Sequence, residues 1–577
     1  MEPVSMKSMV TLMVAILFSI TQISAQSLVR GYVKDKITGE LLGYCTIGVA
    51  GKSKGCISNE EGGFELILDL ERDSLRFKYL GYEPSIVAAK DVFRDKIVTL
   101  LPARNQMAAV EIFAGKDYLY RILSDCRKEL LKAKAIPAKV YFSLDTEMAN
   151  QPVEMLECYY NGNIQGSQIS DLKLKSGRVG LAEQENGSLF VSMNTSDALR
   201  MVNLTSGNDL LPQIPLQLSL SKLKKDFELN RINNGDSTLY QIEFKPKKRN
   251  VGFEGQVWLD KTSHAIRKIE LRQDSCQIHP FEALRKGDSL IYVSMDVLQS
   301  FQEFPEGNRL NHTSFSYEIH FLHADAKGHF NSPKKAVFTT GRMYIYDYTK
   351  AFRLPVFKYD AVPYSYFGDY HKIANMPYNP SFWEHNTGLL YTERQESILK
   401  FLQTQGRLIH FNKAIKSGPT DGFFFEQNNV FWSDTSRIYL RKSMVPSSPD
   451  RQRLHAQIFL DINEDEDTIR HFSVTVLDVF TSYFESDNPR QAACFLNIYF
   501  DLCEMERRRM EQQIKRSKSA VSQIIEIHQK ATRTIQDLTD QYLQKTSYGS
   551  NLNELRKWNA SVKAVLGIDN FRLQGLE

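Results

Sequence analysis

Residues 58–68 read SNEEGGFELIL, a polar turn with two adjacent glycines that leads directly into an alternating apolar stretch. The Asn, Glu and Gly residues are typical of a tight turn, and the alternation from Phe64 to Leu68 is typical of a strand with one buried face. Further strand-like runs recur about every ten residues, at 28–33, 41–49, 74–79 and 96–100. Because no convincing helix interrupts them, residues 27–112 are predicted to form a β-sandwich.

Several motifs in this segment stand in the order and spacing of a known domain family. They are Val29-Arg30-Gly31-Tyr32-Val33, Thr38-Gly39-Glu40, Gly55, Ser58-Asn59-Glu60-Glu61-Gly62-Gly63-Phe64 and Leu80-Gly81-Tyr82. On these residues the segment resembles the carboxypeptidase-regulatory-like domain of secreted and outer-membrane proteins of Bacteroidetes. The resemblance implies a transthyretin-like, seven-stranded sandwich that serves as a structural or interaction module. In this interpretation Gly62 and Gly63 allow the sharp turn before Phe64, which anchors the core. Gly81 lets the chain bend while Tyr82 packs.

The composition of the whole chain excludes several classes of protein. At about 150 residues per domain, 577 residues predict three or four globular units. Hydrophobic residues make up 42% and charged residues 24%, which excludes wholesale disorder. The 72 Lys and Arg residues nearly balance 68 Asp and Glu, so the net charge of +4 gives no global field for holding nucleic acid, and no such partner is expected. After residue 25 no run approaches the roughly 20 apolar residues that a membrane-spanning helix needs.

The first 25 residues have the layout of a signal peptide. A polar start with Lys7 precedes an apolar run from Met9 to Ile20, and the small residue Ala25 precedes Gln26. The apolar run of about 12 residues is too short to span a bilayer comfortably. We therefore expect export to the periplasm or the outer membrane, with an uncleaved membrane anchor as the alternative.

Export would place the cysteines in an oxidising compartment, where thiols tend to pair. The seven cysteines are widely spread and odd in number, which does not indicate a disulfide framework. Cys45 and Cys56 either bridge two neighbouring strands or remain buried free thiols.

Residues 116–350 are predicted to form a helix followed by an antiparallel β-meander. Residues 118–134 have helical spacing, with one apolar face formed by Leu119, Ile122, Leu123, Cys126, Leu130 and Leu131. Alternating strands follow, and the sequence from Phe253 through Leu271 resembles strands of large exported Bacteroidetes proteins and, more distantly, the curved sheets of periplasmic lipoprotein carriers. A scaffold sheet is the first interpretation, and a half-barrel that shelters an apolar ligand is the alternative.

Residues 351–450 are interpreted as an aromatic and proline-rich connector of mixed structure. Rings crowd residues 344–383, and the interleaved prolines disfavour long regular elements. We expect an ordered loop wrapped on the sheet, with a binding surface for sugars or peptides as the alternative. A helix is expected at 388–406.

Residues 451–577 are predicted to be helical. The runs 455–460 and 472–484 are compatible with helices, and a long helix with a coiled-coil seam is expected from Arg490 onward. After Tyr548-Gly549-Ser550, residues 552–565 offer an antiparallel partner, which gives a helical hairpin for docking or self-association.

The first helix of this hairpin carries a run of basic residues, namely Arg507, Arg508, Arg509, Lys515, Arg516 and Lys518. These residues either make peripheral contact with an anionic membrane surface or pair with interleaved glutamates one turn away. Pairing on a solvated face is the first interpretation.

Two short motifs resemble metal-binding sites, but both matches are weak. His279-Pro280-Phe281-Glu282, followed by His385 and His410, resembles the ligand pattern of a zinc carboxypeptidase, but no alternating helices and parallel strands surround it. Residues 461–467 resemble the start of an EF-hand loop, yet Glu466 and Phe472 stand where Gly and Glu are required, so a solvated acidic turn is expected.

The sequence therefore predicts a multidomain, mainly β protein with an N-terminal transthyretin-like sandwich, a central antiparallel sheet and a helical C-terminal region. No catalytic, cofactor-binding or metal-ligating residue is assigned. The expected function is that of a non-catalytic exported envelope protein that binds or assembles through its sandwich, with other envelope proteins or an extracellular ligand as partners. The alternatives are a zinc-dependent carboxypeptidase-like enzyme and a carrier of an apolar ligand in the central sheet.

Overall fold

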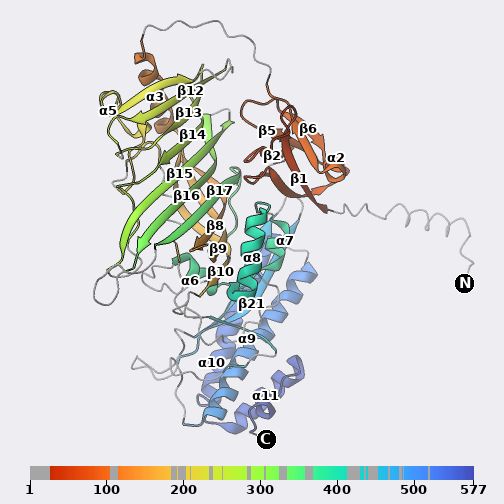
Figure 1. Ribbon diagram of the computed structural model, residues 1–577. Helices are drawn as coiled ribbons and strands as arrows, with labels where there is room; N and C mark the ends of the chain where they lie inside the picture. The colour runs from red at the N-terminus through yellow and green to blue at the C-terminus, as the bar shows by residue number, and fades with distance from the viewer. Residues whose placement is uncertain are drawn as a thin grey trace, which may run out of the picture. The chain divides into compact units, whose positions relative to one another are not determined.

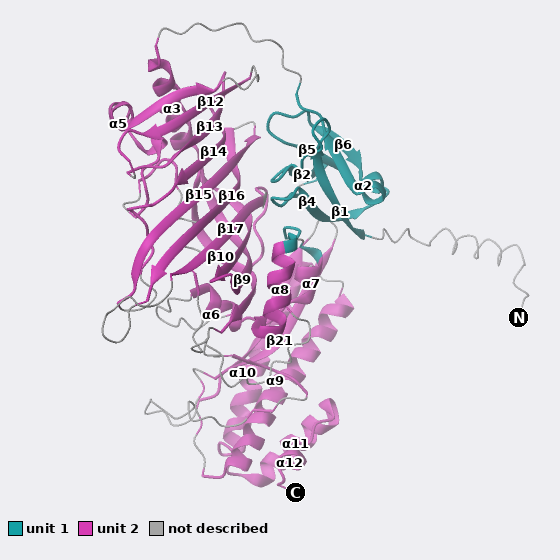
Figure 2. Ribbon diagram, in the orientation of Figure 1, with its two compact units in different colours: residues 1–106, 385–393 teal, residues 107–384, 394–577 magenta. Residues whose placement is uncertain are grey.

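The computed structural model divides into two compact units (Figure 2). Unit 1 comprises Met1–Gln106 and His385–Glu393, and unit 2 comprises Met107–Glu384 and Arg394–Glu577. The structure describes residues 26–52, 54–103, 115–183, 191–192, 203–207, 210–232, 238–249, 251–282, 287–304, 307–323, 334–357, 368–386, 388–411, 429–434, 437–438, 453–464, 468–479, 482, 484, 487–517 and 520–576. The signal peptide expected at 1–25 lies outside these residues.

Unit 1 contains a β-sandwich of seven strands in two sheets, as the resemblance implies (Figure 1). In one sheet, of order β4-β1-β7, β1 (Gln26–Asp35) is antiparallel to β4 (Gly63–Asp69) and parallel to β7 (Ile97–Leu100). The other sheet has the order β3-β2-β5-β6 and consists of β2 (Thr46–Val49), β3 (Gly55–Ile57), β5 (Ser74–Lys78) and β6 (Ser85–Ala88). Phe64 is fully buried and meets Phe77 edge to face at 5.5 Å, which confirms it as a core anchor.

A short helix, α2 (Ala89–Asp95), lies in the segment where no helix was expected. It buries Ala89 and Val92 in the sandwich core and ends at Lys96, whose φ of 57° is left-handed. The expectation of no helix was wrong because a helix of seven residues with two buried positions is too short to show a helical period in the sequence.

Unit 2 is built on one sheet of eleven strands in the order β11-β12-β13-β14-β15-β16-β17-β8-β9-β10-β18. The strands are β8 (Ile136–Met148), β9 (Gln151–Gln165), β10 (Gln168–Ala182), β11 (Phe227–Ile232), β12 (Leu239–Pro246), β13 (Glu254–Asp260), β14 (Ile266–Gln273), β15 (Ser289–Phe304), β16 (Gly307–Leu322), β17 (Lys335–Asp347) and β18 (Gly406–Ile409). Every neighbouring pair is antiparallel, which confirms the predicted meander.

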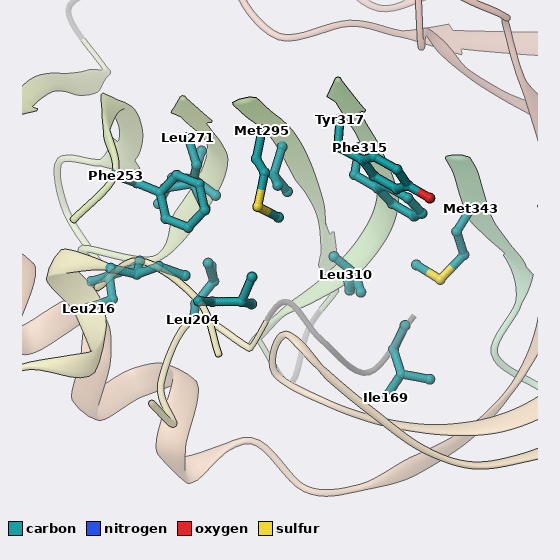
Figure 3. Packing of buried hydrophobic residues seen from close by; sticks show 14 of the residues in the cluster. Ile169, Leu204, Leu216, Phe253, Leu271, Met295, Leu310, Phe315, Tyr317 and Met343 are labelled. Atoms are coloured by element: carbon teal, nitrogen blue, oxygen red, sulfur yellow. The ribbon is translucent and has the colours of Figure 1, made fainter. Parts of the chain in front are cut away.

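One face of this sheet packs on α3 (Asp117–Lys132), η1 (Pro215–Gln217) and α5 (Leu220–Asp226). Helix α3 buries Leu119, Ile122, Leu123, Cys126 and Leu130 as predicted, whereas Leu131 is 49% exposed. Figure 3 shows Met295, Tyr317 and Met343 pointing from their strands toward Leu204 and Ile169. Because Ile169 belongs to β10 and joins the same cluster, the sheet curls around its apolar core.

The connector contributes α6 (Gly368–Ala374), α7 (Pro380–His385) and α8 (Glu393–Gln405). Helix α8 confirms the helix expected at 388–406 from Glu393 onward, whereas residues 388–392 are not helical. Among the described aromatic side chains of the connector, Tyr370 and Phe382 are at most 1% exposed, and the others are half-buried. The rings of Phe382 and Trp383 lie 5.1 and 5.2 Å from that of Tyr159. Aromatic residues between 358 and 367 lie outside the described part of the chain. Tyr370, Phe382 and Trp383 therefore act as packing groups, and the alternative of a sugar- or peptide-binding surface stays a prediction.

The prediction of helix at 455–460 and 472–484 was wrong. These residues belong largely to the hairpin of β20 (Ala456–Glu464) and β21 (Ile469–Asp478), which forms a three-stranded sheet with β19 (Asn429–Phe431). Ile458 and Leu460 face one apolar cluster while Phe459 faces another. A strand buried on both faces shows a continuous apolar run, which periodicity cannot distinguish from a helix.

The expected long helix is divided into α9 (Pro489–Ser517) and α10 (Val521–Lys545), which pack against each other with α11 (Leu552–Leu566) and the short α12 (Asn570–Leu573). Helix α9 ends at Ser517, and Ile514 of α9 and Ile535 of α10 are core residues of a folded-back pair rather than of one seam. In the described part of the chain, no helix combines the length and apolarity that crossing a bilayer requires.

Candidate functional site

The turn that opens β4 is the candidate binding site of unit 1. Asn59 is 1% exposed, and its Oδ1 accepts hydrogen bonds from the backbone N–H groups of Glu61 (3.0 Å) and Gly63 (2.8 Å). Gly62 has a φ of +73°, and a Cβ there would lie 2.8 Å from the carbonyl oxygen of Val33, so glycine is required. The amide oxygen of Asn59 therefore holds the turn, which leaves its Nδ2 as a donor to other groups.

Gly63 has a different role from the one that its sequence position suggests. Its backbone does not have a positive φ. A Cβ at Gly63 would lie 3.0 Å from Cδ2 of Leu390 and 3.2 Å from Cε1 of Tyr32. Glycine at this position therefore makes room for two side chains, and only Gly62 meets the conformational need of the turn.

Leu390 reaches this turn from a segment 331 residues further along the chain. The segment His385–Glu393 belongs to unit 1 (Figure 2), and Asn59 Nδ2 donates a hydrogen bond of 3.0 Å to the carbonyl oxygen of Leu390. The sandwich thus binds a distant peptide segment through one side-chain amide and one glycine.

Apolar side chains lie exposed beside the same turn. Tyr32 on β1 and Ile97 on β7 are register partners with exposed fractions of 43% and 48%. Outward-facing strand positions are ordinarily polar, as the Arg30–Glu65 pair of β1 and β4 is, with 2.9 Å between Nε and Oε2. Tyr32 and Ile97 therefore place an apolar pair on the solvent side of this sheet, next to the turn.

None of the cysteines has the lowered pKa of a reactive thiol. All seven cysteines are buried and free, including Cys45 and Cys56, which form no disulfide. Burial raises the pKa of Cys45 to about 12, and it raises the pKa of Cys56 as well. A nucleophilic cysteine needs a lowered pKa and an accessible position, so these two are packing residues.

The histidines of the zinc hypothesis do not form a ligand set. Among the described residues, no group of three or more His, Cys, Asp or Glu side chains is placed to hold a metal ion. His279 stacks on Phe281, and Glu282 is exposed. His410 Nε2 lies 2.9 Å from the carbonyl oxygen of Ile373, and burial lowers the pKa of this histidine to about 4.

The acidic stretch at 461–467 makes ion pairs within unit 2. Asp461 is 2% exposed and pairs with the buried Lys175, so the expected solvated turn begins in the core. Glu464 pairs with Lys350 (2.7 Å) and Arg353 (2.8 Å), which lowers the pKa of its carboxyl. Residues 465–467 lie outside the described ranges. The described carboxylates are therefore occupied by cations of the protein itself.

The basic run on α9 is also paired. Glu504 accepts hydrogen bonds from Arg507 (2.8 Å) and Arg508 (2.9 Å), and Arg509 lies 3.2 Å from Glu506. The pairing of these three arginines is confirmed, but it was wrong to expect a solvated face, because Glu504 (1% exposed) and Glu506 (7%) are buried. Membrane contact by this helix stays a prediction, and Lys518 lies outside the described part.

A buried carboxyl lies beside the apolar core of the large sheet. Glu154 on β9 is fully buried and accepts hydrogen bonds from Thr146 Oγ1 (2.9 Å), the Ser192 N–H (3.1 Å) and the Tyr370 hydroxyl. Burial raises the pKa of Glu154, and these hydrogen bonds oppose the shift. Perturbed carboxyls of this kind are enriched at functional sites, although structural networks produce them too.

These features define a class of protein by its architecture: one unit with a seven-stranded β-sandwich and a second unit of sheet and helices, with no metal cluster assembled among the described residues. Residues 29–112 match the family model of the CarboxypepD_reg-like domain, so the sandwich is a domain of this regulatory, non-catalytic class. No curated protein matches the chain.

Three solved structures illustrate how distant the structural likenesses are. A LolA superfamily protein from Nitrosomonas europaea has 12% identity and a TM-score of 0.16, over 41% of this chain and 99% of that one. MucB in complex with MucA has 9% identity and a TM-score of 0.14, over 39% and 93%. A DUF1329 family protein from Desulfovibrio piger has 7% identity and a TM-score of 0.18, over 40% and 92%. TM-scores this low establish neither a shared fold nor a shared function.

Sequence reasoning found the Asn59–Gly63 turn but missed the segment that it binds. The motif around Gly62 and Gly63 was visible as a family signature. Leu390 carries no comparable signal, because nothing in the local sequence of a leucine indicates a partner 331 residues away. The outward direction of the Asn59 amide likewise depends on hydrogen bonds that exist only in the folded turn.

Proposed function

We propose that this protein is a non-catalytic assembly or binding protein of the cell envelope, with the sandwich as its docking module and unit 2 as the scaffold. The observation that carries the proposal is the contact of Asn59 and Gly63 with Leu390, because it shows the sandwich binding an extended segment through a main-chain hydrogen bond and a side-chain contact. The regulatory-like class of the domain supports a binding role. The signal-peptide layout of residues 1–25 supports the envelope.

Fractionation of the host cell tests the location and processing of the protein. We expect the mature chain, beginning at Gln26, in the periplasmic or outer-membrane fraction. Recovery in the cytoplasm with Met1 retained would contradict the proposal. Metal analysis of the same material separates this function from the zinc peptidase, because stoichiometric zinc with peptidase activity would favour the enzyme.

Carriage of an apolar molecule by the central sheet is a second candidate, which the buried Glu154 favours. Glu154 is a fully buried carboxyl beside a large apolar cluster, and in this candidate function it would bind the polar end of a ligand in exchange for one of its present hydrogen bonds. Native mass spectrometry of protein purified from its own host tests this function. A co-purifying amphiphile that Glu154→Gln loses would support it, and a mass equal to the bare polypeptide would contradict it.

A further inference from the structure

The contact between the sandwich and Leu390 has the chemistry of a general peptide site. Asn59 Nδ2 donates to a main-chain carbonyl, which every peptide offers regardless of its side chains. The amide oxygen is already used by Glu61 and Gly63, so the side chain presents a donor and not an acceptor in this direction. Asn59 therefore recognises backbone, and the space above Gly63 recognises one aliphatic side chain.

The same site extends beyond the residues that fill it. The Tyr32 ring lies over Gly63 together with Leu390, yet Tyr32 stays 43% exposed. Its register partner Ile97 is 48% exposed. An apolar surface thus continues from the occupied position, and an occupant with a second apolar side chain would cover more of it than the present segment does.

The segment His385–Glu393 is anchored independently at both ends. Within unit 2, Trp383 Nε1 donates to Ser176 Oγ at 3.0 Å, and Arg394 Nη1 donates to Asp145 Oδ1 at 2.6 Å. Release of Leu390 from the sandwich therefore leaves these two flanking contacts in place. The segment is tethered, so it acts at a high effective concentration, and a free competitor must overcome that advantage.

We propose that Asn59, Gly63 and Tyr32 form a docking site for an extended peptide with a leucine-type side chain, and that residues 388–392 occupy it as an internal ligand. A partner segment of the same chemistry displaces them. This inference rests on the proposed function and names the kind of partner that the sandwich takes.

Fluorescence anisotropy with the full mature chain tests the proposal, with a labelled synthetic peptide of residues 385–393 as the probe. Wild type should bind the probe weakly because its own segment fills the site. Leu390→Asp in the protein empties the site, so affinity for the probe should rise about ten-fold or more. A probe with Asp in place of Leu390 should not bind.

Two further substitutions in the Leu390→Asp protein identify the site itself. Asn59→Asp keeps the oxygen that holds the turn but replaces the outward donor with an acceptor, so probe affinity should fall about ten-fold. Gly63→Val fills the space of the leucine side chain and should have the same effect. Gly48→Ala is the matched control, because a Cβ at Gly48 meets nothing within 4 Å.

Hydrogen exchange on otherwise wild-type protein gives a second readout. Asn59→Asp should lower the protection of residues 388–392 while leaving β1 and β4 protected. The inference is overturned if Leu390→Asp binds the probe no better than wild type, or if Asn59→Asp and Gly63→Val leave binding unchanged. Because this assay is independent of cellular location, its failure is distinguishable from failure of the proposed envelope function.

Discussion

The buried pair between Lys175 on β10 and Asp461 on β20 gives the sharpest prediction for stability. The side chains are 0% and 3% exposed, and Lys175 Nζ donates both to Asp461 Oδ1 and to the carbonyl oxygen of Arg353 (2.7 Å). The pair joins the large sheet to the C-terminal strands. Lys175→Met keeps most of the side-chain volume and removes the cation.

The magnitude follows from what the substitution leaves behind. Asp461 keeps hydrogen bonds from Asn379 (2.7 Å) and Asn463 (3.4 Å) but loses its counter-charge, and removing one partner of a buried pair costs about 3–5 kcal/mol. The double variant Lys175→Met/Asp461→Leu removes both charges. Its cost should be smaller than the sum of the two single costs, because no buried charge is then left without a counter-charge.

Urea unfolding followed by circular dichroism measures these free energies of unfolding. Wild type, Lys175→Met, Asp461→Leu and the double variant form a double-mutant cycle. Lys350→Met is the control, because Lys350 pairs with Glu464 on the same hairpin but is 58% exposed, so less than about 1 kcal/mol should be lost. A Lys175→Met protein within about 1 kcal/mol of wild type, or costs that simply add, would refute the reasoning.

Three further substitutions test the rest of the fold. Burial beside Arg342 lowers the pKa of the fully buried His312 from 6.5 to about 3. The neutral imidazole therefore contributes its full stability above pH 6.5, and this contribution is lost as the pH falls toward 3. Between pH 6.5 and 4.5, urea titrations should show that wild type loses about 2 kcal/mol more free energy of unfolding than His312→Gln. Phe64→Ala should cost unit 1 about 3–5 kcal/mol in calorimetry, and an unchanged transition would disprove its anchoring role. Asp501→Leu leaves the guanidinium of Arg437 without its carboxylate (3.0 Å) and should cost about 3–5 kcal/mol in urea, whereas a loss below about 1 kcal/mol would contradict the burial argument.

The parts of the fold that the sequence predicted are those whose signals are local. The alternation around Phe64, the helical face of α3 and the hairpins of the large sheet all appear within windows of ten to twenty residues. The strand β20 was misread because Ile458, Phe459 and Leu460 are buried on both faces, and this burial depends on helices and rings elsewhere in the chain.

The candidate site was predicted only in part, for the same reason. Gly62 carries a conformational requirement that a sequence motif records. Gly63 and the Nδ2 of Asn59 owe their binding roles to Leu390, and a contact between residues so distant has no local signal. Functional reasoning from the sequence therefore identified the module but not its occupant.

The central claim is that the sandwich is the docking module of an envelope protein, and site-specific photocrosslinking in the host cell tests it most directly. A photoreactive amino acid at Tyr32 lies on the exposed apolar surface, and the same amino acid at the exposed Lys90 on α2 is the control. The account predicts a discrete crosslinked product with another envelope protein in the periplasmic or outer-membrane fraction, from Tyr32 and not from Lys90. Equal or absent crosslinking at both positions would contradict it.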